Sequence, residues 1–133
     1  MAEEIKTRRV TMIQVSEYLA KARSSSWPPP PNWRPRSIAA TSLAIHAGIN
    51  AADAVCGARL KERAAGQGHR EVIKLLGRSG DDGSLLAKDL QRLLPLKTTA
   101  EYEPDDIPLT KASTAVERAK RCVDVARRVV EAL

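Results

Sequence analysis

The sequence predicts an all-α protein, an up-and-down bundle of four to five helices in a single domain of residues 1–133. Apolar residues recur at steps of three and four over long stretches, which is the spacing of one face of a helix. The chain contains no Phe, two Trp and two Tyr, so its core must be built from Ala, Leu, Val and Ile. Such a core suits closely packed helices better than a sheet with an aromatic and β-branched surface. With 43% apolar residues, the chain can bury one sizeable core.

The first helix is expected to begin near Thr11. Thr11 and Gln14 have the spacing of a capping box, in which each side chain bonds to the backbone N–H of the other residue. The helix should end before a connector at about 24–36, whose prolines forbid a helix and favour an extended conformation. The connector holds Trp27 and Trp33, which either pin it onto the bundle or belong to a proline-rich ligand for an SH3-like or WW-like domain.

The second helix is expected from Ser37 to about Arg63 and is apolar around most of its circumference, which makes it the central helix. His46, Asn50 and Asp53 recur in it at i, i+4 and i+7, so they form one polar stripe between apolar flanks. We expect this stripe to be shielded from open water and to need partners, because an unpaired buried polar group costs about 1–3 kcal/mol. The three residues either satisfy one another and nearby backbone groups, or they form a ligand site or a dimer interface.

Two glycines are expected to stop the second helix, and His69–Leu76 forms a short third helix with its apolar residues turned inward. The composition of residues 77–83 predicts a loop, after which Ser84 caps a fourth helix. Pro95 should kink or divide that helix, because proline removes a backbone donor and crowds the preceding turn.

The last helix is expected from about Thr110 to Leu133, with apolar residues at three- and four-residue steps. Its outer face mixes three acidic residues with six basic ones: Lys111, Arg118, Lys120, Arg121, Arg127 and Arg128. This face is either a solvated surface or a contact surface for nucleic acid. The net charge of +6 and the pI of about 9.7 favour an anionic partner without demanding one.

Cys56 and Cys122 both lie on apolar helical faces, where thiols usually act as small hydrophobic groups. No zinc site, disulfide framework or cofactor is expected from them. The N-terminal residues lack the apolar core of a signal peptide, and no run approaches the roughly 18 apolar residues of a membrane span. These observations predict a cytoplasmic protein without a membrane segment.

Several segments, in their order along the chain, resemble the HEPN superfamily, the helical domains named for higher eukaryote and prokaryote nucleotide binding. The resemblance covers most of the chain. It is carried by Ala44-Ile-His46-Ala and Ala51-Ala52-Asp53-Ala in the second helix, Gly68-His69-Arg-Glu-Val-Ile-Lys-Leu-Leu76, and Lys97-Thr-Thr-Ala-Glu-Tyr102-Glu-Pro before the closing Ala-rich helix.

The resemblance implies one of two activities. Some HEPN proteins are metal-independent endoribonucleases with an Arg followed a few residues later by His, and Arg63 and His69 fit this spacing with five residues between them. In that chemistry His69 would move a proton from the attacking ribose 2′-hydroxyl, and Arg63 would stabilise the charge on the phosphorane. Other members lack the motif and act as non-catalytic partners, often beside a nucleotidyltransferase. The polar residue that usually follows the Arg is replaced here by Ala64-Ala65-Gly66.

The sequence therefore predicts a small HEPN-like binding or interaction module, linked to RNA and to a bacterial toxin–antitoxin, defence or nucleotidyltransferase-associated system. An endoribonuclease using Arg63 and His69 is the first alternative, and a purely structural dimerisation protein is the second. The resemblance implies a homodimer, with RNA or a nucleotide as ligand and an antitoxin or a nucleotidyltransferase as partner protein. The candidate binding residues are His46, Asn50, Asp53, Arg70 and Tyr102.

Overall fold

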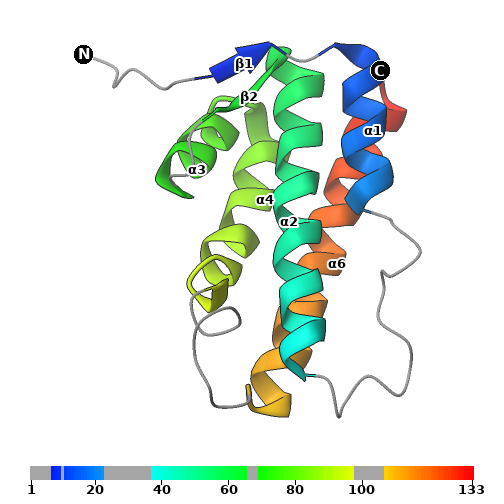
Figure 1. Ribbon diagram of the computed structural model, residues 1–133. Helices are drawn as coiled ribbons and strands as arrows, with labels where there is room; N and C mark the ends of the chain where they lie inside the picture. Colours follow the sequence, from blue (N-terminus) through cyan, green and yellow to red (C-terminus); the bar gives the residue numbers. More distant parts are fainter. Residues whose placement is uncertain (1–6, 10, 23–36, 66–68, 98–106) are drawn as a thin grey trace.

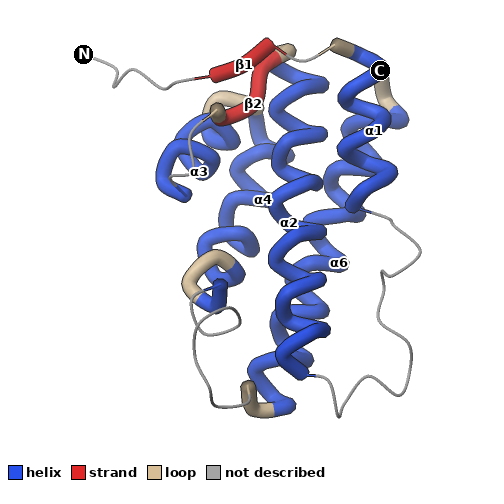
Figure 2. Tube along the Cα trace, viewed as in Figure 1, coloured by secondary structure: helices blue, strands red, loops and turns tan. Residues whose placement is uncertain are grey.

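The computed structural model describes residues 7–9, 11–22, 37–65, 69–97 and 107–133. In this part of the chain, 83% of the residues are helical, which confirms the all-α class. The five helices and two short strands, shown in Figures 1 and 2, are β1 (Thr7–Arg9), α1 (Met12–Ala22), α2 (Ser37–Leu60), β2 (Glu62–Ala64), α3 (His69–Gly77), α4 (Gly80–Leu93) and α6 (Leu109–Glu131).

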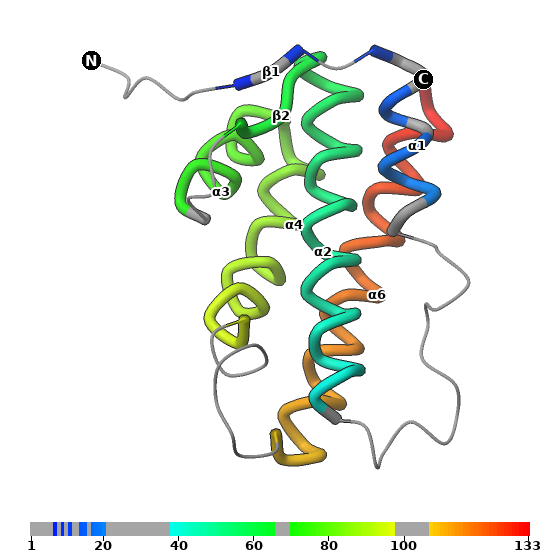
Figure 3. Tube along the Cα trace, viewed as in Figure 1, coloured from blue at the N-terminus to red at the C-terminus, as the bar shows by residue number. Residues whose placement is uncertain are grey.

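The four longer helices form an up-and-down bundle around α2. Colour along the chain in Figure 3 shows α1 running away from the strands, α2 running back toward them, α4 running away and α6 returning. α2 packs against α6, α1 and α4, while α3 packs on α4 and β2 at the end of the bundle that carries the strands. The expected central position of the second helix is confirmed.

Small side chains fill the interface between α2 and its neighbours. Seven residues of α2 in the main core cluster are nearly or completely buried aliphatic groups: Ala40, Ala44, Ala47, Ala51, Ala52, Ala54 and Val55. α6 presents Ala112, Ala115, Ala119 and Ala126 in the same way, whereas α3 and α4 supply the larger buried leucines. At the end of the chain Val125 is buried, whereas Leu133 is 60% exposed.

α2 is long and apolar enough to cross a membrane by length and composition alone. Its window at Ile38–Leu60 has a mean hydropathy of 1.2, so the expectation that no segment approaches a span was too strict. The bundle buries 56% of this window, and the core helix of a globular domain meets the same criteria of length and hydropathy.

The expected capping box starts α1. The backbone N–H of Gln14 donates to Thr11 Oγ1 at 3.2 Å, and the backbone N–H of Thr11 donates to Gln14 Oε1 at 3.0 Å. The two bonds satisfy backbone N–H groups at the start of the helix, where no carbonyl oxygen of the preceding turn is available. Both residues are exposed. The connector at about 24–36, with both tryptophans, lies outside the described residues.

The second helix was expected to continue to about Arg63, but it ends at Leu60. The backbone N–H of Lys61 still bonds to the Gly57 carbonyl oxygen at 2.9 Å, but Lys61 has a φ of 58°, in the left-handed region that ends helices. The chain then enters β2, which pairs antiparallel with β1. Three-residue strands are too short to show an alternating pattern, so no periodicity in the sequence indicates this sheet.

The fourth helix begins at Gly80, so the predicted loop at residues 77–83 is wrong. Only Arg78 and Ser79 separate α3 from α4, and Asp81 lies with a second aspartate in the first turn of α4, where a carboxylate is favoured by the helix dipole. Ser79 is buried, and its hydroxyl donates to the Leu75 carbonyl oxygen at 3.1 Å. As expected, the fourth helix ends just before Pro95.

Gly83 brings α4 against the last turn of α3. A Cβ at this position would lie 2.1 Å from the Leu76 carbonyl oxygen and 2.7 Å from the Ser79 Cβ. We therefore expect Gly83→Ala to lower the free energy of unfolding by about 3 kcal/mol or more, because the backbone must shift to accept the methyl group. Chemical denaturation followed by circular dichroism measures this change.

Gly77→Ala is the matched control, since a Cβ at Gly77 has nothing within 4 Å. This variant should be as stable as the parent or more stable by about 0.5–1 kcal/mol, because alanine is the better helix former. Equal stabilities of the two variants would contradict the close approach at Gly83.

Candidate functional site

The polar stripe of α2 is more open than expected. His46 is exposed, and Asn50 and Asp53 are half-buried, so the expectation of shielding is wrong for His46. α1 has 11 residues against 24 in α2, and in Figure 1 it lies beside the part of α2 nearer to β2 and leaves the other part uncovered by α1. The Asn50 amide donates to the His46 carbonyl oxygen at 2.9 Å, which gives this side chain a partner on its own helix.

Arg63 lies half-buried on β2, where its guanidinium has local partners. Its Nη1 donates to the Ala64 carbonyl oxygen at 3.3 Å, and its Cζ lies 5.9 Å from the centre of the Tyr18 ring. This cation–π contact joins β2 to α1. His69 is the first residue of α3, but its side chain lies outside the described part of the structure, as does Tyr102. Arg70 is exposed on α3.

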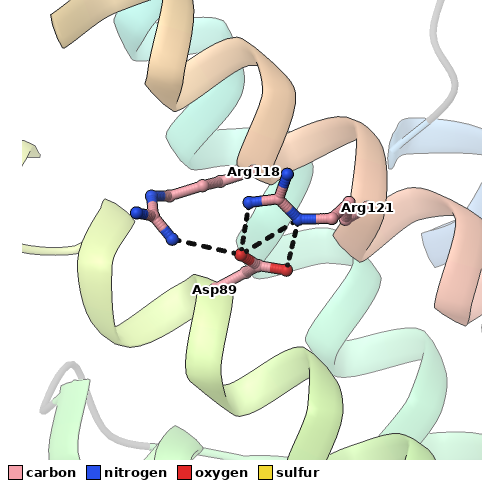
Figure 4. Close-up of polar contacts among 3 residues, drawn as sticks. All are labelled: Asp89, Arg118 and Arg121. Carbon is pink, nitrogen blue, oxygen red and sulfur yellow. Dashed lines mark hydrogen bonds and ion pairs between the residues drawn. The ribbon is translucent and has the colours of Figure 1, made fainter.

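A carboxylate that the sequence did not single out joins α4 to α6. Asp89 accepts from Arg121 Nη2 at 2.8 Å and Nε at 3.1 Å, and from Arg118 Nη1 at 3.3 Å (Figure 4). The Asp89 side chain is only 13% exposed, so both guanidiniums converge on a largely buried carboxylate. The hydrogen bond to Asp89 raises the pKa of Arg121. We call these three residues the Asp89 clamp.

Other cations of the basic face have acidic partners too. Asp82 on α4 is 3.0 Å from the guanidinium of Arg59 on α2 and 3.8 Å from that of Arg128 on α6. Along α6 itself, Lys120 pairs with Glu117 at 3.5 Å and Arg127 with Glu131 at 3.5 Å. These pairs are exposed and add about 0–1 kcal/mol each, but they show that much of the positive charge is balanced within the chain.

A pocket between the end of α4 and the start of α6 is lined by three cations, two of which have no acidic partner among the described residues. Its volume is about 330 Å³, and its lining residues are Arg92, Leu96, Thr110, Lys111, Thr114, Ala115 and Arg118. The lining holds three cations and no carboxylate of the described residues. Arg92 and Lys111 are exposed and have no ion-pair partner within the described ranges. We call this feature the cationic pocket, and its charge fits an anion.

A second hollow on the same two helices has mixed charge. It measures about 410 Å³ and is lined by Leu85, Lys88, Asp89, Arg121, Asp124, Val125 and Arg128. Two carboxylates lie in its lining, and Leu85 is 46% exposed beside it. This second hollow is therefore less suited to an anion than the cationic pocket.

The two thiols and the acidic side chains offer no further chemistry in the described ranges. Burial raises the pKa of both Cys56 and Cys122 to about 12, so neither forms a thiolate near neutral pH, as their apolar positions predicted. Among the residues that the structure describes, no group of three His, Cys, Asp or Glu side chains could hold a metal ion.

No protein-family model matches the chain, and no curated protein matches it. The resemblance to the HEPN superfamily accordingly stays a prediction from the order of its sequence segments.

The Asp89 clamp should contribute to stability more than an exposed pair. We expect Asp89→Asn to lower the free energy of unfolding by about 1–2 kcal/mol, because it removes a partly buried charge that accepts several hydrogen bonds. Asp124→Asn is the control, since Asp124 is 65% exposed and its contact with Arg127 measures 3.9 Å. If Asp124→Asn lowered the free energy of unfolding as much as Asp89→Asn, the clamp would contribute no more to stability than an exposed ion pair.

The buried thiols should resist modification in the folded protein. At pH 8 an aromatic disulfide that reacts with free thiols is expected to label neither cysteine within minutes in the folded protein. It should label both after unfolding in denaturant. As pH rises above the ordinary thiol pKa of 9.0, stability should fall, because the unfolded chain then loses protons that the folded chain keeps. Rapid labelling of the native protein at pH 8 would contradict the burial of the thiols.

Proposed function

We propose that this chain is a small helical binding module that contacts RNA through its phosphates. The cationic pocket carries the proposal, because Arg92 and Lys111 line it without an ion-pair partner among the described residues, and the carboxylate that holds Arg118 lies outside the lining. The bacterial toxin–antitoxin, defence or nucleotidyltransferase-associated setting, the cytoplasmic location and the homodimer remain part of the proposal through the HEPN resemblance. Phosphate oxygens are the groups that Arg and Lys side chains contact most in nucleic acids.

The distribution of charge supports the pocket over the rest of the basic face. Arg121, Arg127 and Arg128 each have an acidic partner, so an RNA strand would have to displace those partners to reach them. Among the described residues, no carboxylate competes with an anion for Arg92 or Lys111. Binding at these two side chains therefore breaks no ion pair between described residues.

The geometry around Arg63 favours binding over cleavage. Metal-free cleavage of RNA needs a cation that faces the phosphate where negative charge develops. The Arg63 guanidinium instead lies over the Tyr18 ring and bonds to the Ala64 carbonyl oxygen. These contacts give Arg63 a structural task between β2 and α1, so the endoribonuclease stays the alternative.

The proposal predicts salt-dependent binding of single-stranded RNA that depends on Lys111. Lys111→Gln should weaken binding and make the slope of log K against log salt shallower by about 0.7, the value for one lost phosphate contact on a single strand. Fluorescence anisotropy of an RNA labelled at its 3′ end, measured from 50 to 200 mM salt, gives both quantities.

Lys120→Gln is the matched control, because Lys120 lies on the same helix but is paired with Glu117 and is absent from the pocket lining. It should change affinity and slope much less than Lys111→Gln. Absence of salt-dependent binding by the folded parent would overturn the proposal and leave only a protein partner. Cleavage of the RNA in the presence of a chelator by the parent, but not by His69→Ala, would establish the endoribonuclease instead.

A further inference from the structure

The cationic pocket is small for a ligand site. Its volume of about 330 Å³ lies at the lower end of the range of about 300–1,000 Å³ for small-molecule sites. It is bounded by the last turn of α4, the turn after it and the first turns of α6.

We propose that the cationic pocket binds a terminal phosphate of RNA, a phosphomonoester, in preference to the phosphodiesters within the strand. This inference rests on the proposed function and names the group that the same site selects. A phosphomonoester carries about −1.5 to −2 charges at pH 7 and three acceptor oxygens, as a phosphorylated side chain does. A diester carries a single charge. The two unpaired cations Arg92 and Lys111, with the remaining donors of the Asp89-bonded Arg118, therefore gain more from the monoester.

Arg118 provides a fixed donor in the lining of the pocket. Its Nη1 bonds to Asp89 at 3.3 Å, and its side chain is only 24% exposed. A guanidinium has five N–H donors in a rigid fork, so this bond leaves others for a phosphate oxygen. The Asp89 clamp thus orients Arg118 before any ligand arrives, which lowers the cost of ordering it on binding.

The other two cations are exposed and come from different helices. Arg92 lies in the last turn of α4, and Lys111 lies in the first turns of α6, one on each side of the pocket. Both are exposed and free of ion pairs with the described residues, so each can turn toward a charged group. A dianion in the pocket would have cations of both helices within its lining.

The lining offers little that could read a base. It contains no aromatic side chain for stacking and no Asn, Gln, Asp or Glu within the described residues. The Thr114 hydroxyl already donates to the Thr110 carbonyl oxygen at 3.0 Å. The preference should therefore follow the terminal phosphate and not the sequence of the RNA.

The test compares unlabelled RNAs of one sequence as competitors against an internally labelled strand. One competitor carries a 5′-phosphate, one a 3′-phosphate and one hydroxyl groups at both ends. We expect at least one phosphorylated end to compete about tenfold better than the hydroxyl ends, which corresponds to one additional charge-assisted contact. Comparing the two phosphorylated strands identifies the end, and a second sequence should give the same ratio.

Arg92→Gln locates the effect, with Lys88→Gln as control. Arg92 lines the cationic pocket, whereas Lys88 lies on the same helix and lines the hollow of mixed charge. Both residues are exposed, so both variants should keep the parental thermal unfolding curve. Arg92→Gln should bring the competition ratio close to one, and Lys88→Gln should leave it at the parental value.

Each outcome separates this inference from the proposed function. Equal competition by all three end structures would overturn the terminal-phosphate preference, while salt-dependent binding would still support the RNA-binding proposal. A preference that survives in both Arg92→Gln and Lys111→Gln would overturn the placement in this pocket. Failure of the folded parent to bind any of the strands would overturn both proposals together.

Discussion

The close approach of α2 to α6 and α4 is the constraint on which the rest of the molecule depends. A core without Phe gains little area from any one side chain, so its stability must come from many short contacts between nearby backbones. The alanines of α2 and α6 permit this approach, and Gly48 lets Leu93 of α4 come so near that an added Cβ would lie 3.0 Å from its Cδ1. Larger side chains at these positions would push the helices apart.

The same packing fixes the relation of α4 to α6, and with it the chemistry on their outer surface. Once the two helices are set, Asp89 lies where Arg118 and Arg121 can both reach it, and the cations of the cationic pocket are brought together from both helices. The surface site is thus a product of the interior. The fold places the charges, and the Asp89 clamp sets the direction of one of them.

Local patterns in the sequence predicted the features that local physics controls. The capping box at Thr11 and the long apolar repeat of α6 depend on residues within one or two turns of each other, and both are present in the structure. The start of α4 was missed because glycine and aspartate favour loops by composition. Contact of Gly83 with the last turn of α3 outweighs that preference, and no local pattern shows such a contact.

The candidate site was less predictable, because charge along a sequence does not show which cations are paired. Arg121 and Lys111 look alike on the outer face of the last helix, yet the first is bonded to Asp89 on another helix and the second lines a pocket. In the same way, the spacing of Arg63 and His69 could not show that the Arg63 guanidinium turns toward Tyr18 of α1. The two-stranded sheet likewise depends on pairing between distant segments, and no periodicity in the sequence indicates it.

That small sheet has a consequence for how the molecule can associate. β1 precedes α1 and β2 follows α2, so their pairing closes the open end of the α1–α2 hairpin. Domain swapping exchanges an identical element between two molecules, and α1 is a single helix that could be exchanged in this way. The strand pairing and the Tyr18–Arg63 contact retain α1 from its free end. The pairing of β1 with β2 therefore opposes the exchange of α1 between molecules.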